Sequence, residues 1–176
     1  MQSVRIEAAL APSVGVPAAF GSGSAAVARP DTTFRIALLP LECPDLPASA
    51  VTALTETFRT ELLKTHAFDV MERDRMDRVM EEWGLSVSAC TDVTCALEIG
   101  RVLVVDHMVQ GTVVKVGETY SVNIRMFSVE TSRTSASVTR YCEGCPIDRV
   151  MQLTLPQAAA DLAADALSRA NSALTR

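Results

Sequence analysis

The sequence predicts an α/β fold: a single domain with one mixed β-sheet that ends in an antiparallel meander, with helices packed on at least one face. Three observations support this prediction. Apolar, strand-like segments alternate with amphipathic helical segments early in the chain, the segment 105–141 has the two-residue period of strands, and an alanine-rich helical segment follows. With 176 residues, the chain is long enough for one domain with a substantial core.

Composition and charge exclude several classes of function. Apolar residues make up 48% of the chain and charged residues 21%, which is typical of a globular protein. The formal net charge is −5 and the basic residues are scattered, so we expect no nucleic-acid binding. The sequence has no run of eighteen apolar residues, so we expect no transmembrane segment.

Residues 1–33 are poor in charge and rich in small residues and proline. Arg5 precedes an apolar run at 6–20, and residues 26–28 (AVA) have the small-x-small form of a signal-peptidase site. An acid and two prolines interrupt the run, so a degenerate signal peptide and a plain flexible leader both stay open. On either interpretation we expect 1–33 to be cleaved or disordered, and the folded domain to span 34–176.

The first half of that domain alternates strands with helices. Residues 34–41 form a nearly continuous apolar run, which indicates a strand buried on both faces. The prolines of the loop at 43–47 forbid an immediate helix. Apolar residues spaced three and four apart predict a helix over 49–65, and a short strand follows at 67–71.

A charged helix is predicted over 72–84, with Gly84 as its C-terminal cap. Its alternating acids and arginines favour a solvated, salt-bridged face over a carboxylate site, and its methionines favour core packing over a cofactor site. A linker follows at 85–89, and Thr91 or Asp92 then caps a short helix over 93–102. The apolar stripe of the charged helix consists of Met76, Val79, Met80 and Trp83.

The meander begins with residues 105–114, which are rich in β-branched side chains. Gly117 and Glu118 form a tight reversal in which the glycine supplies a positive φ. A further strand follows over 134–141. The strand between them alternates in the two-residue period of a half-buried strand, with Tyr120, Val122, Ile124 and Met126 against Ser121, Asn123, Arg125 and Phe127.

The chain then returns to helix. A turn at 142–146 leads into a helix over 147–153, and Pro156 restarts an alanine-rich helix. The predicted order is therefore strand, helix, strand, two helices, three strands and helix. The stripe of the last helix consists of Leu162, Ala166, Ala170 and Leu174.

Five cysteines leave three interpretations open. Cys90 with Cys95, and Cys142 with Cys145, form two close pairs, whereas Cys43 stands alone. An exported protein would use the pairs as two local disulfides, and an intracellular one as a four-thiolate zinc site. The third interpretation is thiol–disulfide exchange, with Cys142 as a nucleophile at the start of a helix. We favour the disulfides and expect Cys43 to be a buried free thiol.

The sequence contains none of the common catalytic or cofactor motifs. It has no phosphate-binding loop, dinucleotide fingerprint, zinc-protease motif or nucleophile elbow. His66 is predicted to be a surface residue beside the last carbonyls of its helix, and His107 to be a hydrogen-bonded core or edge residue. We therefore expect no catalytic residues, no metal and no cofactor.

Four short motifs carry a family resemblance. They are RIALLPLE at 35–42, FDVMER at 68–73, IG at 99–100 with VDHMVQG at 105–111, and VET at 129–131. Together they resemble the CsgG/TolB amino-terminal-like family of bacterial envelope proteins. The resemblance covers residues 34–140, and its motifs are structural ones.

The resemblance implies a periplasmic domain that works by contact. Relatives in this family include the curli secretion pore subunit, the amino-terminal domain of the Tol–Pal partner, and lipoprotein activators of cell-wall synthases. Two departures limit the inference. Cys43 does not stand in a lipobox, so a lipid anchor is not supported, and no extra amphipathic hairpins are present, so a membrane pore is not supported.

We therefore predict a non-enzymatic, outer-membrane-associated periplasmic module for protein–protein interaction in an envelope assembly, secretion or cell-wall system. Its partner would be an envelope protein, or a second copy in a homo-oligomer. The alternative function is a thiol–disulfide oxidoreductase that uses the Cys142–Cys145 pair. The alanine-rich helix is a second candidate for docking. The candidate interaction face, which simple solvation explains equally well, consists of Ser121, Asn123, Arg125, Thr134 and Arg140.

Overall fold

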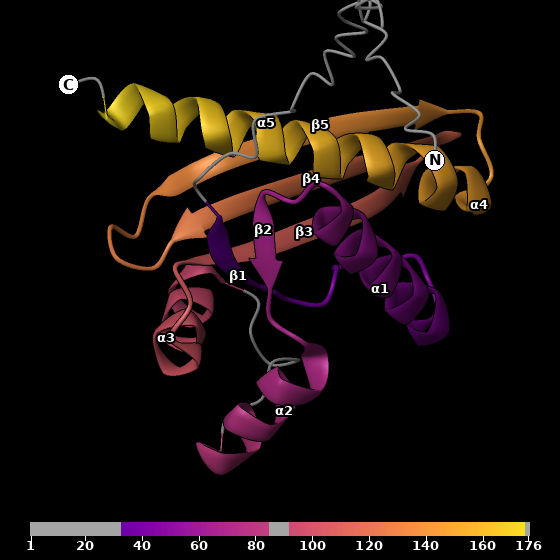
Figure 1. The fold of residues 1–176 in the computed structure, drawn as a ribbon. Coiled ribbons are helices and arrows are strands. Elements are labelled where there is room, and N and C mark those ends of the chain that lie inside the picture. Colours follow the sequence, from indigo (N-terminus) through magenta and orange to yellow (C-terminus); the bar gives the residue numbers. More distant parts are fainter. Residues whose placement is uncertain (1–32, 85–91, 175–176) are drawn as a thin grey trace, which may run out of the picture.

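The computed structural model describes residues 33–84 and 92–174, and its fold is the predicted α/β domain with one mixed sheet (Figure 1). Most of the predicted leader and all of the predicted linker at 85–89 lie outside these ranges. The predicted order of elements is confirmed. The elements are β1 (Phe34–Leu38), α1 (Ala48–Lys64), β2 (Phe68–Val70), α2 (Arg73–Glu82), α3 (Val93–Leu103), β3 (His107–Val116), β4 (Thr119–Ser128), β5 (Thr134–Glu143), α4 (Ile147–Arg149), a π-helical turn (Val150–Thr154) and α5 (Leu155–Leu174).

The five strands lie in the order β2-β1-β3-β4-β5. β1 runs parallel to both β2 and β3, whereas β3, β4 and β5 form the predicted antiparallel meander. Val116 pairs with Thr119 across a two-residue turn, in which Gly117 has a φ of +60°. A glycine at the first central position of such a turn matches the twist of the two flanking strands.

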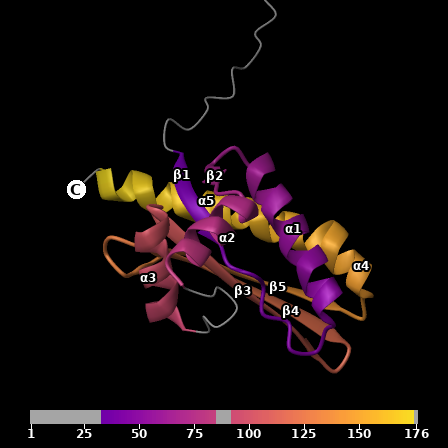
Figure 2. The ribbon, with the colours of Figure 1, turned by 90° about the horizontal axis from the view of Figure 1, so that it is seen from below.

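Helices cover both faces of the sheet, but unequally. α1 and α5 cover one face and enclose the larger core with side chains of all the strands. α2 and α3 lie on the other face, where their buried side chains pack on β1, the start of β3 and residues around it. Figures 1 and 2 show α5 on one side of the sheet, with α2 and α3 on the other; the far half of the meander extends beyond α2 and α3.

The second core is closed by α3. Asp92 begins this helix as one of the two predicted caps, since its Oδ1 accepts a hydrogen bond from the backbone N–H of Cys95 at 2.8 Å. Gly100 lies against the sheet, where an added Cβ would stand 2.6 Å from Val129 Cγ2 and 2.8 Å from Met108 Cγ. The absence of a side chain at Gly100 therefore lets α3 approach β3 closely.

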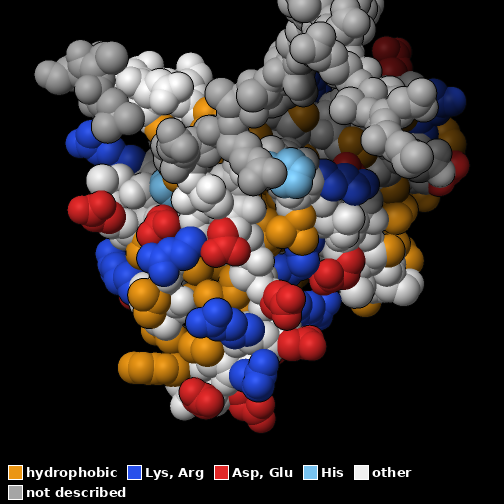
Figure 3. Space-filling view, viewed as in Figure 1, with side chains coloured by type: hydrophobic (Ala, Val, Ile, Leu, Met, Phe, Trp, Pro, Cys, Tyr) orange, Lys and Arg blue, Asp and Glu red, His pale blue; other side chains and the backbone are white. Residues whose placement is uncertain are grey.

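The prediction for α2 is confirmed, with Gly84 at a φ of +63° just after the helix end, except for the burial of Trp83. Met76 and Met80 are buried as expected, but Trp83 is 66% exposed rather than part of the apolar stripe. Trp83 is the residue at which the helix ends, so the helical period no longer sets its direction. The outer face of α2 is charged, and in the view of Figure 3 acids and bases are interspersed on this side of the molecule.

Candidate functional site

The half of the meander that α2 and α3 leave uncovered presents a polar surface. Ser121, Asn123 and Arg125 of β4 point to the face opposite α5, because their neighbours Val122, Ile124 and Met126 are in the core that α5 covers. We call this surface the polar meander face. It consists of Gln110, Thr112, Ser121, Asn123, Arg125, Ser137, Thr139 and Tyr141.

Hydrogen bonds between side chains organise the centre of the polar meander face. Asn123 Nδ2 donates to Ser121 Oγ at 3.1 Å, and Thr139 Oγ1 donates to Asn123 Oδ1 at 2.9 Å. Arg125 is exposed beside them, and Tyr141 is 71% exposed. Part of this surface and the start of α3 line a common hollow of about 460 Å³.

Two of the predicted interaction residues lie elsewhere. Arg140 pairs with Val122 and therefore faces α5, where its Nε donates to Asp161 Oδ2 at 2.6 Å. Thr134 pairs with Phe127 beside a bulge and lies at the end of β5. The polar row of β4 thus continues into Thr139, not Arg140. The sequence did not determine the register between β4 and β5, and a shift of one residue moves a side chain to the other face.

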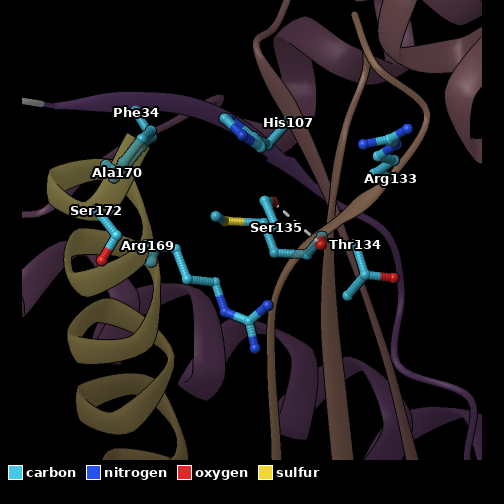
Figure 4. A pocket seen from close by; sticks show the side chains of 10 residues that line it. Phe34, His107, Arg133, Thr134, Ser135, Arg169, Ala170 and Ser172 are labelled. Atoms are coloured by element: carbon cyan, nitrogen blue, oxygen red, sulfur yellow. Dashed lines mark hydrogen bonds between the residues drawn. The ribbon is translucent and has the colours of Figure 1, made fainter. Parts of the chain in front are cut away.

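A groove on the opposite face, which we call the α5 groove, lies between the last turns of α5 and the ends of β1, β3, β4 and β5 (Figure 4). Its volume is about 690 Å³. Its apolar wall consists of Phe34, Met126, Ala166 and Ala170, and its polar side of His107, Arg133, Thr134, Ser135, Arg169 and Ser172. No local sequence pattern indicates this groove, because its residues come from both ends of the domain.

Arg169 is held in place at the α5 groove by Asp165. Arg169 Nε donates to Asp165 Oδ1 at 2.9 Å, and Asp165 Oδ2 accepts a hydrogen bond from the backbone N–H of Ser137 at 3.1 Å. The hydrogen bond from Arg169 lowers the pKa of Asp165, and the Ser137 amide acts in the same direction. Figure 4 shows the Arg169 side chain extending from α5 toward the strand that carries Thr134 and Ser135.

His107 closes one side of the α5 groove. Its ring meets the ring of Phe34 edge-on, with 5.3 Å between centroids. Nδ1 is buried and finds no hydrogen-bond partner in the described part of the chain, so the predicted hydrogen bond is absent at this atom. Burial lowers the pKa of His107, although the nearby Asp106 carboxylate opposes this effect. His66, in contrast, is exposed, as predicted.

The structure tests part of the predicted pairing of the cysteines. A disulfide joins Cys142 to Cys145 at the turn after β5, as we favoured. Cys43 is a buried free thiol, as expected, and burial raises its pKa. Cys90 lies outside the described residues, so its pairing with Cys95 stays a prediction.

The two alternative interpretations of the cysteines find no support. With Cys142 and Cys145 in a disulfide, a four-thiolate zinc site is not formed. Across residues 33–84 and 92–174, no three His, Cys, Asp or Glu side chains gather as metal ligands. The same disulfide gives no support to a reactive thiolate at Cys142. None of the helices described is both long and apolar enough to cross a membrane.

Known proteins share the sequence family and the fold of this chain. Residues 30–139 match the family model described as curli production assembly/transport component CsgG. No curated protein matches the chain.

Solved structures share the fold at low sequence identity. The C-terminal domain of LpoB from Escherichia coli superposes with a TM-score of 0.55 at 14% identity, over 62% of this chain and 82% of that one. The corresponding domain from Salmonella enterica gives 0.54 at 15% identity, over the same shares of the two chains. Lipoprotein GNA1162 from Neisseria meningitidis gives 0.52 at 11% identity, over 73% of this chain and 98% of that one.

Proposed function

This chain belongs to the CsgG family, and on that premise we propose that it is a non-enzymatic protein–protein interaction module of a bacterial envelope assembly, secretion or cell-wall system. The family model is named for an assembly and transport component of curli production, which supports a role in assembling other proteins. The proposal includes a periplasmic location and association with the outer membrane. The Cys142–Cys145 disulfide supports export, because disulfides persist in oxidising compartments.

The observation that carries the proposal is the polar meander face, most of which the described helices leave uncovered. α5 is the described helix that packs closely on β4 and β5, and it lies on the other side of the sheet. Asn123 is held by hydrogen bonds with Ser121 and Thr139. Binding of a partner would therefore cost less conformational entropy, because these side chains are already ordered. Tyrosine and arginine, exposed here as Tyr141 and Arg125, are enriched at the energetic centres of interfaces.

Site-specific crosslinking in the living cell tests this proposal. A photoreactive phenylalanine replaces Tyr141 on the polar meander face, and in a matched control it replaces Leu153, which is 47% exposed in the π-helical turn. We expect a discrete adduct from position 141, which the added substitution Arg125→Glu would reduce. An adduct of equal yield from position 153, or none from position 141, would contradict the proposal.

The mass of that adduct identifies the kind of partner. An increase equal to the mass of the chain itself as isolated from the cell, which is 18.9 kDa if the chain is not cleaved, would indicate a homo-oligomer, and any other increase would indicate a different envelope protein. Separation of the cytoplasm, the periplasm and the two membranes after illumination tests the location. An adduct confined to the cytoplasmic fraction would contradict the periplasmic part of the proposal.

A further inference from the structure

We infer that the α5 groove is a binding site for an organic carboxylate carried on an apolar group, with Arg169 as its main anion-binding residue. The groove lies on the helix-covered side of the sheet, away from the polar meander face, so this inference does not depend on the proposed function.

The charges that line the α5 groove favour an anion. Of the described residues that line it, Arg133 and Arg169 are basic and none is acidic. Asp165 accepts a hydrogen bond from Arg169 Nε, so it uses one edge of the guanidinium and fixes its plane. The two terminal nitrogens form the opposite edge, and Figure 4 shows the guanidinium between α5 and the strand that carries Ser135. A planar guanidinium edge fits the two oxygens of a carboxylate through two parallel hydrogen bonds.

Arg169 is positioned from both sides. Its helix, α5, is anchored to the sheet through buried residues such as Ala166, and Asp165 is in turn held by the backbone N–H of Ser137. Ordering the guanidinium when an anion binds should therefore cost less entropy than it would for a side chain without this hydrogen bond. Thr134 also lines the groove, but its side chain points away from Arg169 (Figure 4), so Arg169 is the residue there that can bind the anion.

The apolar wall of the α5 groove would contact the apolar part of the ligand. Phe34, Met126 and Ala170 line the groove without polar side-chain groups, and the ring of His107 adds a further flat surface. The volume of about 690 Å³ lies within the range of about 300–1,000 Å³ that is typical of sites for small ligands.

The buried Nδ1 of His107 is a second, independent observation. It has no hydrogen-bond partner among the described residues, although His107 lines the groove. A buried polar atom without a protein partner is expected where a bound molecule or an ordered water completes the site.

The carboxylate could belong to a fatty acid or to the free C-terminus of a peptide that ends in apolar residues. Both sources are tested with the full chain, labelled with ¹⁵N and titrated by NMR. The first pair of probes is octanoate and octanol, and the second is N-acetyl-Ala-Leu-Leu with a free carboxylate and the same peptide as its amide. We expect saturable shifts around Ala170 and Arg169 from the octanoate or the acidic peptide, and about tenfold weaker binding of its uncharged counterpart.

Two variants distinguish carboxylate recognition from non-specific adsorption. Arg169→Gln should weaken binding of the better acidic probe about tenfold or more, whereas Arg169→Lys should keep part of the affinity. Arg101→Gln, which removes the same charge from the exposed face of α3, should leave the affinity unchanged.

The inference is overturned if neither acidic probe binds at millimolar concentration, if the uncharged probes bind equally well, or if Arg169→Gln binds like the wild type. Because the acid and amide peptides are compared on the unaltered protein, the test remains decisive even if a variant fails to fold. The crosslinking result at Tyr141 is unaffected by any of these outcomes.

Discussion

Arg59 of α1 donates a hydrogen bond from Nη1 to the backbone carbonyl oxygen of Met71, the residue that follows β2. Arg59 is 8% exposed, and its Nε forms an ion pair of 3.4 Å with Glu56, too poorly aligned to count as a hydrogen bond. Glu56 also lies 3.6 Å from Arg73 Nη1 at the start of α2. A single buried guanidinium thus connects α1 to the end of the three-residue strand β2 and, through Glu56, to α2.

Removing this guanidinium should destabilise the fold. Arg59→Ala leaves the carbonyl of Met71 without its charged donor, and we expect a loss of about 2–3 kcal/mol in the free energy of unfolding, measured by urea denaturation. Arg78→Ala, on the exposed side of α2, is the control and should change it by less than about 0.5 kcal/mol. Equal stabilities for the two variants would show that the bond to Met71 contributes little.

Adding one methyl group to α3 should also be costly. Gly100→Ala places a Cβ against Val129 and Met108, and we expect a loss of about 1–3 kcal/mol even though alanine favours helix. Val129→Ala removes the atom that stands 2.6 Å from the new Cβ, so the double variant should lose less than the sum of the two single changes. A Gly100→Ala protein more stable than the wild type would contradict the close approach of α3.

Stability should fall in mild acid because of His107. Its pKa is lowered in the folded state, so the unfolded chain binds more protons, and stability rises with pH through this range. The stabilisation from neutral His107 is complete at pH values above 6.5, the ordinary pKa of histidine. It is lost as the pH falls from there toward the lower pKa of His107 in the folded state.

Urea midpoints measured from about pH 8 to about pH 5 test this dependence. His107→Gln should flatten the profile in that range, whereas His66→Asn, which removes the exposed histidine at a positive φ, should preserve it. A profile that His107→Gln leaves unchanged would assign the acid sensitivity to other groups.

The disulfide between Cys142 and Cys145 should stabilise the protein modestly. The two residues are three apart, so the closed loop is small, and loop entropy allows about 2 kcal/mol at most. Replacing both cysteines with serine should therefore lower the free energy of unfolding by no more than this amount. The same pair of proteins tests the enzymatic alternative: neither should accelerate the reduction of insulin by dithiothreitol, and a wild-type rate well above that of the variant would favour an oxidoreductase.

Local patterns predicted most of the fold. The two-residue alternation from Tyr120 to Phe127 placed Ser121, Asn123 and Arg125 on one face, and Gly117 marked the hairpin between β3 and β4. These features depend on neighbours close in the chain, so the sequence alone determined them. The same holds for the order of the elements and for the assignment of the β-branched run before Gly117 to a strand.

Contacts between distant segments decided the rest. The bulge between β4 and β5 set the register that turned Arg140 toward Asp161 of α5, and no local period contains that information. The α5 groove likewise exists only because the parallel pairing of β1 with β3 brings Phe34 and His107 to the end of the sheet that α5 crosses with Arg169. Periodicity specifies which way a side chain points from its own strand or helix, but which side chains meet is fixed by pairing and packing across the whole domain.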